Sequence, residues 1–492
     1  MFCLVVSSLY LKFTYALPSG VHSWAQADRY SLACRYLEGG QFSEPKTYNL
    51  MSVDGKVGVE FPILPFISAR VSRLSSPEFL PWIMRGLNAV LLFLGLFLLA
   101  KNLDGDVMQR SAMVAMVFLS PVLVFYSFNF LPDSTGLAIV LLAIAQLLRY
   151  LKSQRNKNWI LALLLAAFAT LVKTTCGIYF IALGASLFLK FIREKKYKSV
   201  VYLVVVQAIT ALLIVLYDVV YFYQVNVDLW SIIFMSESQP IENWKDLQLV
   251  VKGFGYWFGQ WASWYQILTL AIVGVLLRMD NRRVVIDKTL LHFFIISVIG
   301  VILFISQMGK QYVNHDYYFV ASVIPLIFLF AVVLNQQMAQ SSKKIYMVIL
   351  ALGFVLSGIH SFEHYVKRSS SHFTWKNRTI LNDTKWMNNG DDRLLALGVE
   401  KDAKVFVLYE FAPNTPLVYL NRKGRVFNHE EMTREKQNMD YWVDRIKPRY
   451  FIVQKKWNDH IKRDQADLAK SLRLLATDDE LMVYEQQKDL PN

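Results

Sequence analysis

The sequence predicts an all-α polytopic membrane domain followed by a small soluble α/β domain at the C-terminal end. Of its 492 residues, 54% are hydrophobic and only 18% are charged, whereas soluble domains carry about 25% charge. Apolar runs approaching the roughly 20 residues that cross a bilayer as a helix fill the first three quarters of the chain. Acidic residues concentrate after residue 363. These three observations place the chain in the membrane class.

About eleven apolar segments are candidate transmembrane helices. They are 2–17, 79–100, 111–130, 134–151, 158–172, 176–191, 199–223, 264–277, 290–308, 317–335 and 345–361. The first is short and contains Lys12, but it lacks the basic start of a signal peptide, so we interpret it as a span. The segments 158–172 and 176–191 are closely joined and predict a hairpin of two tilted helices.

The positions of lysine and arginine give an independent prediction of topology. They gather in the loops 101–110, 151–157, 190–198, 278–289 and 336–344. All these loops lie on one side if the N-terminus is cytoplasmic, and positive residues favour the cytoplasmic side. We therefore expect the long loops 18–78 and 224–263, and the C-terminal segment, outside the cytoplasm. Topology also explains the net charge of +14 better than a nucleic-acid partner does.

Two domains are predicted, a transmembrane domain over 1–362 and a soluble extracytoplasmic domain over 363–492. The second reads as a small α/β domain, because short β-like runs alternate with helix-like stretches. The β-like runs are Val405–Tyr409, Leu417–Leu420, Tyr450–Val453 and Leu481–Tyr484, and the helix-like stretches lie near 429–446 and 464–476. The three cysteines lie far apart and form no disulfide framework or metal-binding pair.

The unusual polar residues lie in the first outside loop and at the outside ends of the spans. Carriers usually place such residues within their spans, near the midplane. Residues 22–35 read HSWAQADRYSLACR, and Trp24, Ala27 and Cys34 approximate one stripe of an amphipathic helix lying on the membrane surface. Residues 58–65 read GVEFPILP and add a second carboxylate, Glu60. The pattern favours a site at the outer membrane–water boundary.

An HSWxQAD helix, a following GxEFP element, and many spans with a soluble tail resemble the polyprenyl-phosphate-sugar-dependent glycosyltransferases of the GT-C fold. The resemblance is to bacterial relatives of the protein O-mannosyltransferases and the lipid A aminoarabinose transferase, families 39 and 83. Its specific part covers residues 22–65, and the topology supports it over 1–361. It implies an inverting glycosyltransferase in the bacterial inner (plasma) membrane. The donor would be a polyprenyl-phosphate sugar, and the acceptor a lipid, glycan or protein at the outer face.

By this resemblance the catalytic residues are Asp28 and Glu60. Asp28 would act as general base on the acceptor hydroxyl, and Glu60 matches the second acidic position of the family. Relatives often follow that acid with a basic residue, but Phe61 stands here, and Lys56 is a substitute for the phosphate contact. As alternatives, Asp28 pairs with Arg35 on an interfacial helix, and Glu60 is a loop carboxylate paired with a nearby arginine.

Substrate-binding residues are expected at the outside ends of later spans. Lys173 lies alone at an outside junction and could contact phosphate, or it could be a snorkelling anchor. The run 309–318 reads GKQYVNHDYY, where Lys310 and His315 could contact phosphate or sugar. Tyr317 joins this candidate set, although an interfacial aromatic belt explains it and its neighbour as well.

His22 and Trp24 match the family motif and are further substrate-binding candidates. Asp133, at the start of a span, either lines the cavity or caps the helix. His22, Asp28, Glu60 and His315 are suitable ligand types for a metal ion, but no spacing defines a site. No cofactor is certain, and a divalent metal ion stays open.

Two other functions fit a polytopic membrane protein. A transporter or flippase of lipid-linked sugars predicts charges within the spans and internal symmetry, and neither is present in the sequence. A glycan polymerase or ligase usually relies on a large outside loop between late spans. The residues 22–65 therefore favour the glycosyltransferase over both alternatives.

Overall fold

A computed structural model describes residues 16–221, 238–279, 286–338, 344–370, 384–434 and 436–487. The chain folds as two compact units. The first, here called the helical unit, contains the described residues between 84 and 368. The second, here called the mixed unit, combines residues 16–83 with the described residues from 369 onward.

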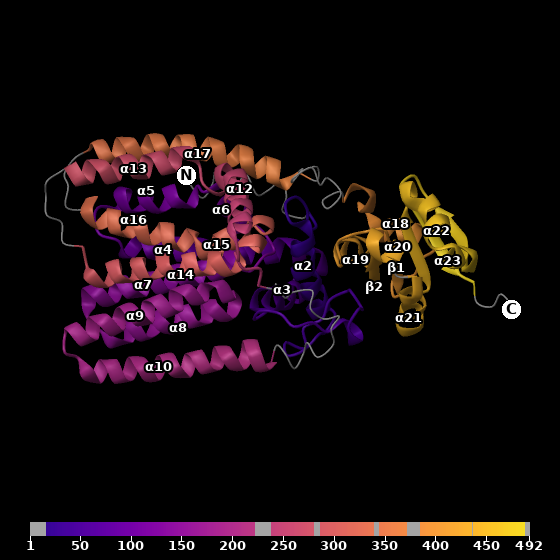
Figure 1. Ribbon diagram of the computed structural model, residues 1–492, viewed down its shortest axis with the longest axis horizontal. Helices are drawn as coiled ribbons and strands as arrows, with labels where there is room; N and C mark the ends of the chain where they lie inside the picture. The colour runs from indigo at the N-terminus through magenta and orange to yellow at the C-terminus, as the bar shows by residue number, and fades with distance from the viewer. Residues whose placement is uncertain are drawn as a thin grey trace. The chain divides into compact units, whose positions relative to one another are not determined.

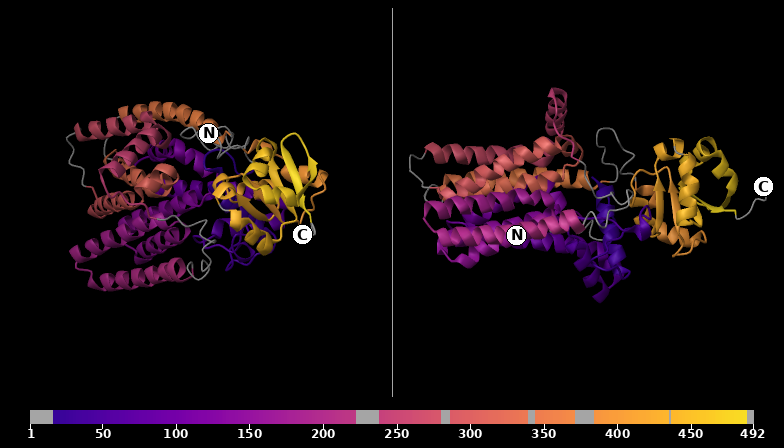
Figure 2. Two further views of the ribbon diagram at one scale, coloured as in Figure 1. Left: turned by 45° about the vertical axis from the view of Figure 1, so that its right-hand side comes forward. Right: turned by 60° about the horizontal axis from the view of Figure 1, so that its bottom comes forward.

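The helical unit is a bundle whose long helices run roughly parallel (Figures 1 and 2). Its long helices are α4 (Leu80–Asn102), α7 (Asp133–Ser153), α8 (Asn156–Val172), α9 (Gly177–Arg193), α10 (Tyr197–Val215), α14 (Lys288–Asn314), α16 (Ile324–Met338) and α17 (Ile345–Ser369). Within the described residues, seven helices are long and apolar enough to cross a membrane, or nine if each of two bent pairs counts as one. The predicted polytopic membrane fold is confirmed, whereas most of the first predicted span, 2–17, lies outside the described residues.

The predicted span 111–130 is wrong as a single helix. The segment forms α5 (Val107–Phe118) and α6 (Pro121–Ser127), which meet at an angle of 87°. Proline has no backbone N–H, and its ring clashes with the preceding turn. Pro121 therefore begins a new helix instead of continuing the old one.

The second outside loop, predicted over 224–263, also contains a helix. Residues Trp244–Trp261 form α12, which meets α13 (Trp264–Met279) at 86°. The side chain of Asn243 caps α12 by accepting a 3.1 Å hydrogen bond from the backbone N–H of Asp246. Charged residues and three glycines dilute the apolar pattern of α12, which is why the sequence did not indicate a helix there.

The mixed unit contains a five-stranded sheet with the strand order β2-β1-β3-β5-β4. The strands are β1 (Val405–Leu408), β2 (Gly424–Phe427), β3 (Tyr450–Gln454), β4 (Leu472–Thr477) and β5 (Leu481–Gln486). β1 pairs in parallel with β2 and β3, and β5 pairs antiparallel with β3 and β4. The predicted small C-terminal α/β domain is confirmed.

Both faces of the sheet are covered, which explains the continuous apolar runs of β1 and β3. Val405 and Val407 point into one core with Trp386, and Phe406 and Leu408 point into the other with Trp442. This alternation is the two-residue period of a strand. The helices beside the sheet are α18 (Gly390–Ala396), α19 (Thr415–Leu420), α20 (His429–Arg434), α21 (Lys436–Ile446), α22 (Asn458–Asp464) and α23 (Ala466–Ser471).

Two local predictions in this domain are wrong. Leu417–Leu420 is helical in α19, which has Pro416 in its first turn, and a short apolar run does not distinguish a strand from a buried helix. Residues 472–476 belong to β4 and not to a helix. The sequence did not indicate β2, whose Arg425 is buried and stacks 3.8 Å from the centre of the Trp442 ring.

The first outside loop belongs to the mixed unit, where it forms α2 (Ser23–Leu37) and α3 (Ile63–Leu74). The segment between these two helices pairs with the edge of the sheet at Gly424. The backbone N–H of Gly424 donates to the Tyr48 carbonyl (3.0 Å), and that of Leu50 donates to the Gly424 carbonyl (2.7 Å). A Cβ at Gly424 would lie 1.7 Å from the carbonyl oxygen of Val405, so only glycine fits. The two units therefore do not follow the single predicted boundary at 362, because the first outside loop and the C-terminal segment belong to the same unit.

Candidate active site

Asp28 lies on the helix predicted in the first outside loop. Before α2, His22 adopts a left-handed conformation (φ 53°). The Gln26 side-chain amide donates to the carbonyls of Ser19 (3.0 Å) and Val21 (2.8 Å), which fixes the chain entering the helix. The helix is confirmed, and ten of its fifteen residues are buried. Its position on the membrane surface stays a prediction. Its small and apolar side chains face several directions instead of one stripe.

Asn414 orients the Asp28 carboxylate. Its Nδ2 donates a 2.8 Å hydrogen bond to Asp28 Oδ1. Its Oδ1 accepts from the backbone N–H of Asn49 (3.1 Å) and from the Ser31 hydroxyl (3.3 Å). A backbone N–H can only donate, so Oδ1 must face Asn49 and the NH₂ group must face Asp28. Both Asn414 and Asp28 are buried.

Burial gives Asp28 the protonation behaviour of a base that works near neutral pH. Desolvation raises the pKa of Asp28 to about 7, against the lowering effects of the Asn414 hydrogen bond and of the charge on Arg29. A general base is most effective when its pKa lies near the working pH. Asp28 therefore combines a fixed orientation with a suitable pKa.

Glu60 pairs with the residue next to Asp28. Arg29 Nη2 lies 3.0 Å from Glu60 Oε2, and both side chains are largely buried. Glu60 thus pairs with a nearby arginine, as the alternative interpretation of this residue expected. The alternative pairing of Asp28 with Arg35 is not found, since Arg35 contacts Glu38 (2.7 Å) instead.

The other candidates of the mixed unit, His22, Trp24 and Lys56, contact side chains of the protein itself. His22 and Trp24 lie edge to face, with ring centroids 6.1 Å apart, where α2 begins. Lys56, the substitute phosphate ligand, pairs with Glu44 at 3.1 Å. Roles for these three side chains in substrate binding stay predictions.

In the helical unit, Lys173 lies between α8 and α9. Its Nζ is 3.7 Å from Asp133 Oδ1, and both side chains are buried. The same Nζ lies 5.8 and 5.6 Å from the ring centres of Tyr317 and Tyr318, within the range of cation–π attraction. Asp133 is the first residue of α7, where Pro132 is the N-cap. The alternative that Asp133 caps the helix is therefore wrong.

His315 joins the same group of side chains. Its ring stacks on Tyr318 (5.5 Å between centroids) and meets Tyr317 edge-on (5.6 Å). Its Nδ1 lies 2.9 Å from the Gln311 carbonyl, which makes Nδ1–H the donor in a neutral ring. Lys173 and His315 thus contact the same pair of tyrosines. Lys310, in contrast, pairs with Asp246 of α12 at 3.0 Å.

The helical unit also contains a buried ion pair that the sequence did not indicate. Arg368 and Asp316 form a hydrogen-bonded pair in which neither side chain is exposed. The Tyr126 hydroxyl donates to the second Asp316 oxygen (2.6 Å), and Arg368 also donates to Gln260 (3.0 Å). Arg368 lies beyond the predicted end of the last span, because α17 continues to Ser369. The sequence signal for this pair was Asp316, the acidic residue in the run 309–318, which needs a cationic partner if it is buried.

No group of three or more His, Cys, Asp or Glu side chains among the described residues could hold a metal ion. Asp28 contacts Asn414, and Glu60 contacts Arg29. The predicted metal alternative therefore gains no support from the arrangement, and no step of the chemistry below is assigned to a metal.

Comparisons with known proteins agree with this architecture. The family model described as dolichyl-phosphate-mannose-protein mannosyltransferase matches residues 62–221. The crystal structure of ArnT from Cupriavidus metallidurans bound to undecaprenyl phosphate is similar over 98% of this chain and 97% of its own, with a TM-score of 0.61 and 12% identity. The chain has the GT-C glycosyltransferase fold.

ArnT in the apo state shares this GT-C fold with the chain, with a TM-score of 0.56 and 11% identity over 98% of this chain and 96% of that one. No curated protein sequence matches the chain. The predicted resemblance to families 39 and 83 is confirmed. The fold shared with ArnT agrees with the predicted GT-C glycosyltransferase.

Proposed function

We propose that this chain is an inverting glycosyltransferase that moves a sugar from a polyprenyl-phosphate donor to an acceptor hydroxyl. The observation that carries the proposal is Asp28, a buried carboxylate held by Asn414 with its pKa raised to about 7. A buried carboxylate costs free energy unless it is paired and hydrogen-bonded. A role as general base gives a reason for the protein to keep a carboxylate in this position.

The reaction is a single displacement at the anomeric carbon. Ionised Asp28 accepts the proton of the acceptor hydroxyl as that oxygen attacks. The new carbon–oxygen bond forms while the bond between the anomeric carbon and the phosphate oxygen breaks. Polyprenyl phosphate leaves with the bonding electron pair. One displacement inverts the configuration of the sugar.

The leaving phosphate needs positive charge that is already in place. Lys173 offers an ammonium group held between Asp133 and two tyrosine rings, and His315 adds a ring on the same tyrosines. We assign donor binding to this group of the helical unit. The donor phosphate would then compete with Asp133 for the Lys173 ammonium.

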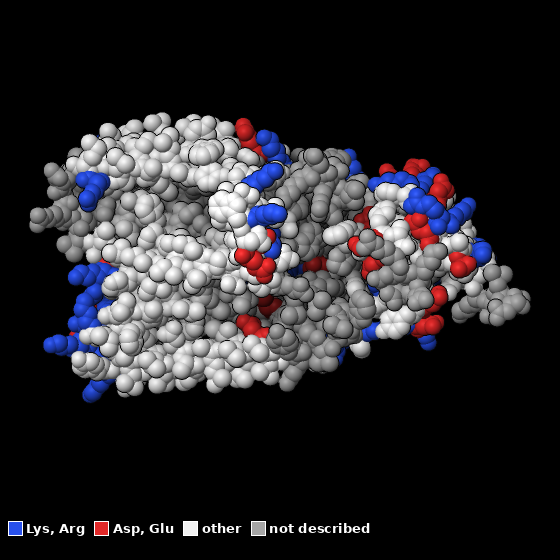
Figure 3. Space-filling model, in the orientation of Figure 1, with Lys and Arg blue, Asp and Glu red and all other residues white. Residues whose placement is uncertain are grey.

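The chain is an integral membrane protein, and we propose that it lies in a bacterial inner membrane with the mixed unit outside the cytoplasm. On the face shown in Figure 3, one end of the helical unit carries mainly lysine and arginine, its middle is almost free of charge, and its other end carries residues of both signs. Positive charge marks the cytoplasmic end of such a bundle. The undecaprenyl phosphate in the ArnT structure supports the choice of donor class.

Donor turnover tests this proposal. The purified chain in lipid nanodiscs would be given a panel of polyprenyl-phosphate sugars with a membrane extract as acceptor. Release of polyprenyl phosphate together with a product of inverted configuration is expected. A retained configuration would contradict the single displacement. If no donor is turned over while lipid-linked sugars cross the bilayer in liposomes, the chain is a flippase.

A further inference from the structure

The mixed unit contains a large open cleft of about 1490 Å³ that the proposed catalytic residues do not line. The second half of α2, the segment 46–54 and turns of the C-terminal segment form its walls. Pockets for small ligands usually measure about 300–1,000 Å³. The cleft is therefore large enough for a ligand of several rings.

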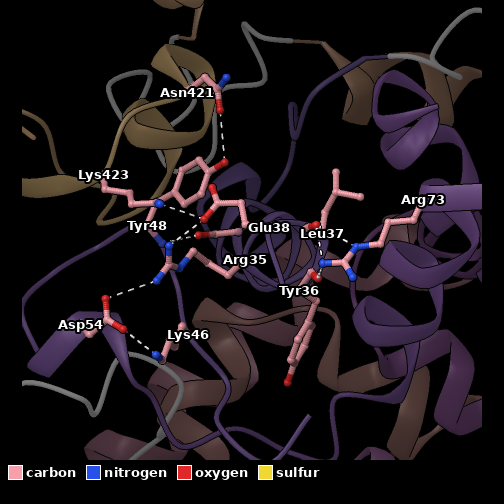
Figure 4. A network of polar contacts seen from close by, with 11 residues as sticks. Arg35, Tyr36, Leu37, Glu38, Lys46, Tyr48, Asp54, Arg73, Asn421 and Lys423 are labelled. Carbon is pink, nitrogen blue, oxygen red and sulfur yellow. Dashed lines mark hydrogen bonds and ion pairs between the residues drawn. The ribbon is translucent and has the colours of Figure 1, made fainter. Parts of the chain in front are cut away.

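Polar side chains from distant parts of the sequence meet in this cleft (Figure 4). Glu38 accepts from Arg35 (2.7 Å) and from Lys423 (2.9 Å), so the first loop and the C-terminal segment share one carboxylate. The Tyr48 hydroxyl donates to Asn421 Oδ1 (3.1 Å) across the same boundary. These contacts hold the polar groups in fixed positions.

Arg73 of α3 contacts the C-terminal end of α2, next to the cleft. Arg73 Nη2 donates to the carbonyls of Tyr36 (3.0 Å) and Leu37 (2.7 Å), which satisfies the last carbonyls of α2 (Figure 4). A helix end needs such partners for its orphan carbonyls. The C-terminal end of α2 is therefore rigid where it borders the cleft.

The charges of the cleft almost cancel. Its lining has six lysine and arginine side chains against five aspartate and glutamate side chains. A site for phosphate or another strong anion would present uncompensated cations. Here cationic and anionic side chains are nearly equal in number, so the lining offers both donors and acceptors. This suits hydroxyl groups, because each hydroxyl both donates and accepts. The lining favours a neutral, hydroxyl-rich ligand.

The reactive side chains of the cleft are suited to binding and not to covalent chemistry. Burial raises the pKa of the Cys34 thiol to about 12, so the thiolate that a nucleophile requires is absent at neutral pH. Burial also raises the pKa of Tyr48, which keeps its hydroxyl protonated. Three tyrosines, Tyr30, Tyr48 and Tyr419, add ring surfaces to the wall.

We infer that this cleft binds a neutral oligosaccharide and that the acceptor of the reaction is a glycan. The second part rests on the proposed function. The cleft and the base are joined by one rigid element, because Arg35 of the cleft follows Asp28 by seven residues on α2. Seven residues of α-helix rise about 10 Å. A glycan in the cleft would thus extend toward the carboxylate that activates its terminal hydroxyl.

Glycan binding in the absence of donor tests the inference. The full chain in nanodiscs would be applied to an array of neutral and anionic oligosaccharides, and the affinity of the best neutral one would then be measured by calorimetry. We expect Tyr48→Phe and Asn421→Ala each to weaken it about tenfold, since each change removes one polar partner in the cleft. Thermal unfolding of each variant verifies its fold.

Tyr484→Phe is the matched control. Its hydroxyl contacts Asn458 in the same unit, but neither residue lines the cleft, so affinity should stay unchanged. Binding of anionic oligosaccharides or inorganic phosphate alone would overturn the inference, as would wild-type affinity in folded Tyr48→Phe. Donor turnover separates the two claims. Loss of turnover with intact glycan binding counts against the proposed function, whereas normal turnover without glycan binding counts against the cleft.

Discussion

Asn414 donates a 2.8 Å hydrogen bond to Asp28, a residue 386 positions earlier in the chain. The donor comes from the C-terminal segment, and the acceptor lies on the first outside loop. The C-terminal segment therefore does more than form the sheet, because it orients the carboxylate that we propose as the base.

Asn414→Ala should shift the pH dependence of transfer. Wild-type kcat/KM should fall below about pH 7 as Asp28 becomes protonated. The Asn414 hydrogen bond stabilises the ionised form, so its loss should raise the pKa of Asp28 by about one to two units. A pH–rate profile should show the acidic limb moving to higher pH. Asn428→Ala removes only the cap of α20 and should leave the limb in place.

Asp28→Asn should stabilise the folded protein at alkaline pH. The pKa of Asp28 is raised from 3.8 to about 7 on folding, so the folded state binds more protons than the unfolded state between these values. Stability should thus fall as pH rises through this window. The loss is on the order of 4 kcal/mol above pH 7. Thermal unfolding in detergent should show the variant melting above wild type at pH 8, with the gap closing near pH 4. Equal melting temperatures at pH 8 would contradict the burial cost.

Lys173 and Asp133 should affect donor binding in opposite directions. Lys173→Met removes the ammonium group, so the affinity for polyprenyl phosphate should fall about ten- to hundredfold, the range for a charge-assisted hydrogen bond. Asp133→Asn removes the competing carboxylate 3.7 Å away, so affinity should rise. Titration of labelled polyprenyl phosphate measures both. Weaker binding in folded Asp133→Asn would show that the ion pair is structural.

A double-mutant cycle separates two roles of Glu60. If Glu60 serves only as the partner of Arg29, then Glu60→Gln, Arg29→Gln and the double variant should reduce stability similarly, with a coupling energy of about 1 kcal/mol. Transfer rates would then follow stability. If Glu60 also positions the acceptor, Glu60→Gln should raise the acceptor KM more than Arg29→Gln does. Steady-state kinetics with varied acceptor decide between the two.

Much of the helical unit could be predicted because apolar length and loop charge are local signals. The break at Pro121 and the helix α12 were the exceptions. In each case a residue pattern within a few positions, proline or scattered glycine, changed the structure of an otherwise apolar segment. The strand β4 was missed because an edge strand with mixed exposure resembles a helix end.

The candidate site could be predicted only where its residues form a short motif. Asp28 and Glu60 were found in this way, but Asn414 has no motif and reaches Asp28 only through the fold. Arg368 was missed for a different reason. It lies beyond the predicted span 345–361 and has no motif, whereas in the fold Asp316 and three aromatic rings contact it in a buried position.

The most direct test of the account is sugar transfer by the purified chain, with wild type and Asp28→Asn compared at pH 8 on the same polyprenyl-phosphate donor. We expect transfer by the wild type and a loss of at least a hundredfold in the folded variant, consistent with the usual contribution of a general base. Transfer at the wild-type rate by folded Asp28→Asn would contradict the central claim that Asp28 is the catalytic base.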